Sequence, residues 1–406
     1  MFEFFFMAVQ HAIILTMRGK LDRVYLDYAA TTPVDPRVIE TMLPCFLDQF
    51  GNPSSAHFYG QQAEEIVQSA RYKLLELCNG KGYELFFTSG GSESDNLAIR
   101  GVAFAEKAKR GANKILISSV EHHAVLETAR QMQEIHGFIT QELRVDNYGF
   151  VDLNQLEKSL TEDVALVSII LANNEIGTIN NVRVISDICH QRGVPFHTDA
   201  VQAAAHQLLD LQEMQVDLLS IGAHKFYGPK GVGALIKKKD LILTPQITGG
   251  AQENHLRAGT ENVPYIRGMV RALECVREDL NAENDRLIVL RDELINGVVS
   301  LVKGARLTGH PEKRLPNHAS FVIEGVNGND LLIALDMAGF AVSSGSACKV
   351  GNPKPSEVLL ALGIAPELAL GSLRISLGRA TKDEDVYKLL EVMPAIIGKL
   401  RNGFIK

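Results

Sequence analysis

The chain of 406 residues contains no tryptophan, only five cysteines, no excess of basic residues and no long uninterrupted apolar run. Its 41 Lys and Arg residues stand against 48 Asp and Glu residues. The resulting net charge of -7 gives no electrostatic reason to expect nucleic acid or an anionic membrane as a partner. We therefore expect neither, and a small-molecule function is favoured.

The few cysteines are odd in number, far apart and without a CxxC pair, so they indicate neither a disulfide framework nor a zinc site. This usage fits a reducing cytosol, and we expect a cytoplasmic protein without a bound metal. The five residues are Cys45, Cys78, Cys189, Cys275 and Cys348.

The apolar start of the chain, residues 1–16, is interrupted by Glu3, Gln10 and His11 and is shorter than the ~20 residues of a membrane span. It also lacks the basic segment and the small-residue cleavage site of a signal peptide. We expect Met17 to be the natural start and residues 1–16 to be an extension of little consequence. The alternative is a helix that binds a partner.

Composition and periodicity predict an α/β protein. Hydrophobic residues make up 46% and charged residues 22%, and at roughly 100 to 200 residues per domain the length predicts two domains. Short Val/Ile/Leu-rich runs alternate with amphipathic stretches, which favours parallel strands covered by helices on both faces. The runs are YELFFT (83–88), KILISS (114–119), VALVSIILA (164–172), VPFHTDA (194–200), VDLLSIGA (216–223) and GVGALIKK (231–238).

The pattern changes after Val263, where a long charged and apolar alternation predicts a connecting helix with a solvated face. Short strands at RLPNHASFVIEG (314–325) and GSLRISLG (371–378) follow, with helices from Gly328 and Lys382. We interpret this part as a smaller α+β domain and place the boundary near residue 280.

The turn TSGGSESDNLAI (88–99) connects a strand to a helix through glycines. The free N–H groups at a helix N-terminus bind anions, most plausibly a phosphate. Taken alone, such a segment is more often an ordinary turn.

Two further motifs, HTDAVQ (197–202) and SIGAHKFYGPKG (220–231), place Asp199 and Lys225 after two predicted strands of one sheet. Open α/β sheets bind ligands at this edge. Pyridoxal phosphate (PLP) requires a lysine for its Schiff base, an acid beside its pyridine nitrogen and a phosphate site, and these segments supply all three. The alternative for Lys225 is a surface lysine, although its frame of an apolar strand and a Gly/Pro turn argues against that.

In these motifs the chain resembles the cysteine desulfurases of the NifS/IscS type, PLP-dependent enzymes of the aspartate aminotransferase fold. The resemblance runs from about Val24 to the C-terminus. The matching segments are YLDYAATTP (25–33), GNPSSAH (51–57), TSGGSESDNLAI, EHHAVLET (121–128), NNEIGT (173–178), HTDAVQ, AHKFYGPKGVGAL (223–235), GGAQENHLRAGTENVP (249–264), SSGSAC (343–348) and SLRISLGR (372–379).

The resemblance implies a fold-type-I transferase. Its large PLP-binding domain, residues 35–279, would contain a mostly parallel seven-stranded sheet, and residues 17–34 and 280–406 would form the small domain. It implies that Lys225 forms the Schiff base, that Asp199 partners the pyridine nitrogen and that His122 stacks on the ring and passes protons. The other cofactor contacts that it implies are Gly91, Ser92 and His224 at the phosphate, Gln202 at the phenolic oxygen, and Asn174.

Toward the substrate, the resemblance implies that Asn174 and Arg374 hold the carboxylate of L-cysteine. Cys348, in an exposed-loop composition, would be the thiolate that takes the sulfur as a persulfide while L-alanine is formed. Thr260 would reach the phosphate in the partner subunit, which implies a homodimer. The sulfur would then pass to an acceptor protein such as an iron–sulfur scaffold, or to tRNA thiolation.

Two departures from the family pattern concern the phosphate and the cysteine loop. Gly222 stands where a phosphate-binding serine is common, so Ser220 or a backbone N–H would have to compensate. Lys349 and Lys354 add positive charge after Cys348, which favours a thiolate and bears on the choice of acceptor.

The alternatives are an aminotransferase or a selenocysteine lyase on the same fold, and a catalytically idle scaffold within a sulfur-transfer complex. Cys348 argues against the aminotransferase, which needs no thiol. The joint presence of Lys225, Asp199, His122 and Arg374 argues against the scaffold.

Overall fold

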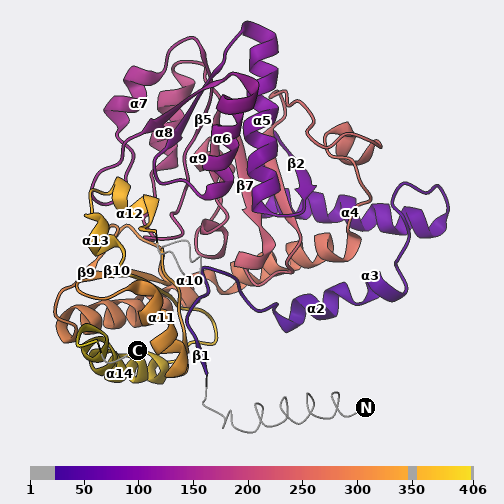
Figure 1. Cartoon of the computed structure of the whole chain (residues 1–406). Coiled ribbons are helices and arrows are strands. Elements are labelled where there is room, and N and C mark those ends of the chain that lie inside the picture. Colours follow the sequence, from indigo (N-terminus) through magenta and orange to yellow (C-terminus); the bar gives the residue numbers. More distant parts are fainter. Residues whose placement is uncertain (1–22, 346–353, 404–406) are drawn as a thin grey trace, which may run out of the picture.

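The computed structural model describes residues 23–345 and 354–403, which form two sheets with their covering helices and a short two-stranded pair (Figure 1). The largest sheet has seven strands, and only β8 runs antiparallel to its neighbours. This confirms the predicted mostly parallel seven-stranded sheet. In spatial order the strands are β2 (Tyr83–Thr88), β8 (Gly233–Lys238), β7 (Leu218–Gly222), β6 (Phe196–Asp199), β5 (Val164–Ser168), β3 (Lys114–Ser118) and β4 (Ile139–Leu143).

Both faces of this sheet are buried, as the continuous apolar runs predict. Leu218 lies in a hydrophobic cluster with residues of α5 (Gly91–Arg110) and α6 (His123–His136), whereas its neighbour Leu219 lies in the cluster of the opposite face. That second cluster includes residues of α4 (Phe58–Leu77), α8 (Val182–His190) and α10 (Val263–Leu301). Each fully buried aliphatic side chain contributes about 1.5–3 kcal/mol, so burial of both faces of the sheet stabilises the fold.

The other helical elements of this part are short and lie in the connections. They are α2 (Pro36–Met42), α3 (Pro44–Leu47), α7 (Leu153–Ser159), α9 (Leu211–Met214), and the 3₁₀ turns η1 (Ala203–Ala205), η2 (Ala223–Lys225) and η3 (Gln252–His255).

The long helix α10 connects two hydrophobic cores. Its residues up to Val276 belong to the cluster under the seven-stranded sheet, and from Leu287 onward they belong to a separate cluster with Phe321 and Leu373. The second core contains a three-stranded antiparallel sheet. Its elements are β9 (Ala305–Leu307), β10 (His318–Ile323), β12 (Ser372–Ser376), the parallel pair β1 (Val24–Tyr25) and β11 (Phe340–Ala341), and helices α11 (Gly328–Met337) and α14 (Asp383–Arg401). Two short helices, α12 (Glu357–Ala361) and α13 (Pro366–Ala369), belong to a smaller adjoining cluster.

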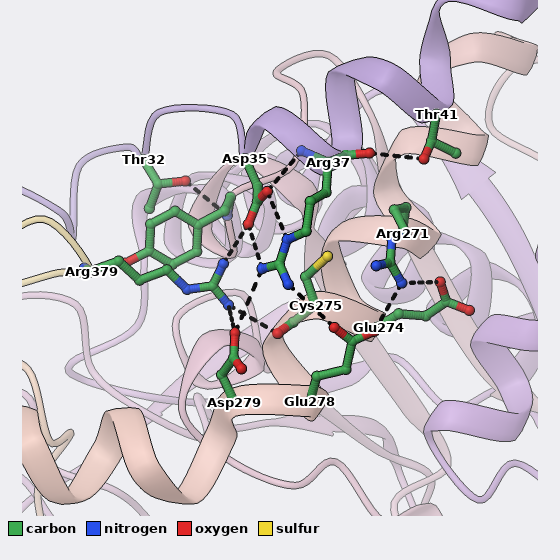
Figure 2. A network of polar contacts seen from close by, with 11 residues as sticks. Thr32, Asp35, Arg37, Thr41, Arg271, Glu274, Cys275, Glu278, Asp279 and Arg379 are labelled. Atoms are coloured by element: carbon green, nitrogen blue, oxygen red, sulfur yellow. Dashed lines mark hydrogen bonds and ion pairs between the residues drawn. The ribbon is translucent and has the colours of Figure 1, made fainter.

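A polar network joins these parts beside the turn that carries Lys225 (Figure 2). Asp35, the N-cap of α2, accepts from Arg37 and from Arg379, each at 2.7 Å, and these guanidinium groups hold the pKa of Asp35 below its usual range. The Arg379 guanidinium also lies 4.5 Å from the centre of the Tyr227 ring. The network therefore fixes the segment after β12 against the turn that carries Lys225 and Tyr227.

Every helix in the described parts of the chain is too short or too polar to cross a lipid bilayer.

Candidate active site

The predicted phosphate turn connects β2 directly to α5. Gly90 is the N-cap of α5 and provides no side-chain cap, so the first N–H groups of a 20-residue helix remain available to an anion. A Cβ at Gly91 would lie 2.5 Å from the Val201 side chain, and a Cβ at Gly233 would lie 2.6 Å from the Gly90 backbone. The glycines thus let the helix start approach the ends of neighbouring strands.

Asp199 and Lys225 come together because they follow adjacent strands. Asp199 ends β6, is buried, and accepts from the Val201 N–H at 2.8 Å. Lys225 lies in η2 immediately after β7, and its Nζ donates to the carbonyls of Ala29 and Ala30 at 2.7 and 2.8 Å. The segment 29–30 precedes α2, so the lysine is held from outside the sheet.

Burial perturbs both groups in opposite directions. It lowers the pKa of Lys225 to about 8, with the Arg374 charge adding to the effect and Asp199 opposing it. It raises the pKa of Asp199, and the nearby His122 and Lys225 oppose that rise. Removal of the His122 ring from water lowers its pKa as well. A lysine with an accessible neutral form beside an acid is typical of a catalytic site.

These residues line one cavity of about 290 Å³, near the lower limit for ligand pockets of about 300 Å³. It brings together nine of the predicted site residues: Gly91, Ser92, His122, Asn174, Asp199, Gln202, His224, Lys225 and Arg374. Two predicted residues are not among them. Thr260 lies on an exposed segment between η3 and α10, and Cys348 lies outside the described residues.

Arg374 reaches the cavity from β12 of the small sheet. Its Nη2 donates to Asp27 Oδ1 at 2.9 Å and its Nη1 to the Asn174 carbonyl at 3.1 Å, whereas its buried Nε has no partner among the described residues. His318 Nε2 also lies 3.1 Å from the same Asn174 carbonyl. The guanidinium is therefore fixed in orientation, and each of its terminal nitrogens has a second N–H beyond these contacts.

At Gly222, where the family commonly has a serine, the surroundings leave little room for a side chain. A Cβ at this position would lie 3.2 Å from the Gly91 N, so little room is left beside the phosphate turn. The expectation that the Ser220 hydroxyl compensates is not supported, because that hydroxyl lies 2.9 Å from His197 Nε2 within the core. The uncapped N–H groups of α5 remain for the phosphate.

The residues present fit pyridoxal phosphate. The uncapped start of α5 suits its phosphate, the buried Asp199 suits its ring nitrogen, and the amine of Lys225 suits its aldehyde. Gln202 and His224 also line this cavity. Gln202 Nε2 donates to the Ala29 carbonyl at 2.7 Å, and His224 Nδ1 lies 3.2 Å from Thr31 Oγ1.

Three sets of groups in or next to the cavity were not singled out from the sequence. Asp27 holds Arg374 from outside the cavity lining, the carbonyls of Ala29 and Ala30 hold Lys225, and Asp95 of α5 lines the cavity. All of them lie in segments that match the family's motifs, and this match was the only sign in the sequence that they belong to the site.

Comparison with known proteins places this site in a family. The chain belongs to the aminotransferase class-V family, whose model matches residues 24–389, and this family uses pyridoxal phosphate. Among its relatives, "Cysteine desulfurase IscS" of Clostridium botulinum is 45% identical over 381 residues, which are 93% of this chain and 95% of that protein. The "Cysteine desulfurase IscS" of Dictyoglomus turgidum is 47% identical over 378 residues, 93% of this chain and 95% of that protein.

The solved structure of a "NifS-like protein" matches 93% of this chain and 100% of its own, with a TM-score of 0.86 at 36% identity. These matches confirm the predicted family, fold, cofactor and enzyme class: a PLP-dependent enzyme similar to the cysteine desulfurases of the NifS/IscS type.

Proposed function

We propose that the chain converts L-cysteine to L-alanine and leaves the sulfur on Cys348 as a persulfide. The observation that carries the proposal is the convergence of Lys225, Asp199, His122 and Arg374 on one cavity, in a chain 45% identical to cysteine desulfurases over 93% of its length.

Bound PLP would supply an electron sink for the substrate α-carbon. Asp199 would keep the ring nitrogen protonated, and Gly91, Ser92 and His224 would hold the phosphate. Gln202 would contact the phenolic oxygen. Lys225 Nζ would take the proton from the α-carbon and return it, a task that suits an amine whose pKa is lowered to about 8.

Substrate orientation would come from Arg374 and Asn174. Asp27 and the Asn174 carbonyl each accept one N–H from a terminal guanidinium nitrogen, and the second N–H of each terminal nitrogen would be available to the substrate carboxylate. A charge-assisted contact of this kind is worth about 1.5–3 kcal/mol.

The sulfur step balances without an external oxidant. The thiolate of Cys348 attacks the substrate Sγ, the S–S bond forms as the substrate Cβ–S bond breaks, and the carbon retains the electron pair and takes a proton to become the methyl group of alanine. A later thiol or acceptor protein, such as an iron–sulfur scaffold, would remove the terminal sulfur.

The proposal extends to the assembly. Four apolar side chains on α3, on the segment after it and at the start of α4 are each more than half exposed: Phe46, Leu47, Phe50 and Phe58. Such a group of exposed apolar side chains favours a subunit interface. Thr260, exposed in its own chain, would then serve the partner's phosphate. Leu47→Asp should give a monomer in light scattering where the unmodified chain gives a homodimer, and an unmodified monomer contradicts this part.

We also propose a cytoplasmic location and a division into two domains. Cytoplasmic location is supported by the four described cysteines, which are buried and unpaired. The division near residue 280, with residues 17–34 and 280–406 in the small domain, is supported by the change of hydrophobic cluster along α10.

The direct test is to measure alanine and sulfide from L-cysteine with a reductant present. We expect equal amounts of both, and we expect Lys225→Ala to lose turnover and the visible absorbance of bound PLP. Amino-group transfer to a 2-oxo acid without sulfide favours the aminotransferase, selective action on selenocysteine favours the lyase, and no turnover favours the scaffold.

A further inference from the structure

A second buried aspartate lies next to Asp199. Asp95, in the first turns of α5, is 1% exposed and Asp199 is 4% exposed. One polar side-chain atom from each of Asp95, His122 and Asp199 lies within 4.8 Å of the other two. Two carboxylates at such a distance in a buried site do not readily ionise together.

Within residues 23–345 and 354–403, no Lys or Arg side chain forms an ion pair with Asp95. Its Oδ1 has no hydrogen-bond partner among the described residues, and the ring of His197 approaches it at 3.7 Å. Both nitrogens of His197 contact serine hydroxyls, Nδ1 with Ser168 at 2.8 Å and Nε2 with Ser220 at 2.9 Å. Burial lowers the pKa of this histidine to about 3, so His197 is neutral and does not balance a charge on Asp95.

A third buried acid, Glu121, interacts electrostatically with both aspartates. Glu121 is buried, its Oε1 accepts from the Ser118 hydroxyl and from the Ile170 N–H, and its Oε2 has no partner in the described parts of the chain. Burial raises the pKa of Glu121 to about 8. The groups that favour a negative charge instead face Asp199, which accepts from the Val201 N–H at 2.8 Å and has the Lys225 amine nearby.

We propose that Asp95 is a protonated, neutral carboxylic acid at neutral pH and acts as a positioning residue that leaves the negative charge of the pair on Asp199. Burial and the neighbouring Asp199 raise the pKa of Asp95 well above its ordinary range, against a hydrogen bond with Ser220. The inference rests on the proposed function insofar as Asp199 is the partner of the PLP ring nitrogen.

The charge state of Asp95 can be measured directly. Infrared difference spectra between the wild-type holoenzyme and Asp95→Asn at neutral pH should show the loss of one protonated-carboxyl band. Glu121→Gln is the comparison variant, because Glu121 is a different buried acid whose pKa is raised to about 8. Any band that this variant loses should differ in frequency from the Asp95 band, which should remain. No band lost in Asp95→Asn means that Asp95 is ionised and overturns the proposal.

The second readout is cofactor binding. Since the amide of Asp95→Asn has the charge and shape of the neutral acid, its PLP affinity and the pH titration of its PLP absorbance should match the wild type. Asp199→Asn should bind PLP about tenfold or more weakly, because it loses a charge-assisted contact. An Asp95→Asn variant that loses affinity to the same extent as Asp199→Asn contradicts the assignment.

Ser220→Ala serves as a second variant in case Asp95→Asn does not fold. It removes the hydrogen bond that favours the ionised form, so the acid band should persist to higher pH than in the wild type, and a band lost at lower pH overturns the proposal. Failure of the proposed function is distinguishable, because a chain that makes no alanine from cysteine can still show the Asp95 band.

Discussion

The lowered pKa of Lys225 predicts an unusual pH dependence for capture of PLP by the apoenzyme. Burial and Arg374 lower this pKa from 10.5 to about 8. Only the neutral amine attacks an aldehyde. At pH 8 about half of the Lys225 side chains are neutral, against about 0.3% for a lysine of ordinary pKa, a difference of about 150-fold.

The assay is the rate of the absorbance change when PLP is mixed with apoenzyme from about pH 6 to about pH 10, the range that brackets both pKa values. The rate should rise about tenfold per pH unit and become constant above about pH 8. Arg374→Gln removes a positive charge that lowers this pKa, so its inflection should move to higher pH.

Arg183→Gln is the matched control, because Arg183 pairs with Asp187 on the exposed face of α8 and the substitution removes an equal charge. Its inflection should stay at the wild-type pH. A wild-type rate that still rises at pH 10, or an Arg374→Gln profile identical to the wild type, refutes the assigned environment of Lys225.

Three further predictions follow from single contacts. Arg374→Ala should weaken the apparent affinity for cysteine by about 10- to 150-fold with PLP binding retained, in steady-state kinetics and PLP titration; unchanged affinity removes Arg374 from the substrate site. Burial raises the pKa of Glu175 to about 7, above 4.5 in the unfolded chain, so its stabilising contribution is complete below pH 4.5 and is lost as pH rises through 7. The free energy of unfolding of Glu175→Gln, relative to the wild type, should therefore be about 1–3 kcal/mol higher at pH 8 than at pH 5 in denaturant titrations. The same difference between variant and wild type at both pH values counts against this assignment. Gly177→Ala should lower the free energy of unfolding by about 2–4 kcal/mol, because Gly177 has φ +78° and a Cβ there lies 2.8 Å from His318 Nδ1. Gly193→Ala, at φ +65° with open space around it, should cost only about 1 kcal/mol, and equal losses show that the His318 contact is unimportant.

The central strands and the position of the site could be predicted from the sequence because their signals are local. Continuous apolar runs mark β5 and β7, and the short buried strand β6 lies between them in the sheet. Asp199 ends β6 and Lys225 follows β7. Parallel neighbours end at the same edge of a sheet, so sequence order alone brings these side chains together.

Other elements depend on contacts between distant segments. The edge strand β4, ITQEL, has partly exposed residues and no continuous apolar run, and β1 forms its pair with β11 over 300 residues later in the chain. Asp95 lies three residues after Ser92 in a motif that also suits a solvated helix start. Its burial results from packing of α5 against several strands of the large sheet, which no local pattern reports.

The most direct test of the central claim is mass spectrometry of the wild type and of Cys348→Ser after treatment with L-cysteine. The account predicts one added sulfur on the wild-type peptide that contains Cys348. It also predicts that the serine variant binds PLP and cysteine and releases almost no sulfide. Full sulfide release by Cys348→Ser, or added sulfur only on Cys45, Cys78, Cys189 or Cys275, contradicts the proposed sulfur transfer.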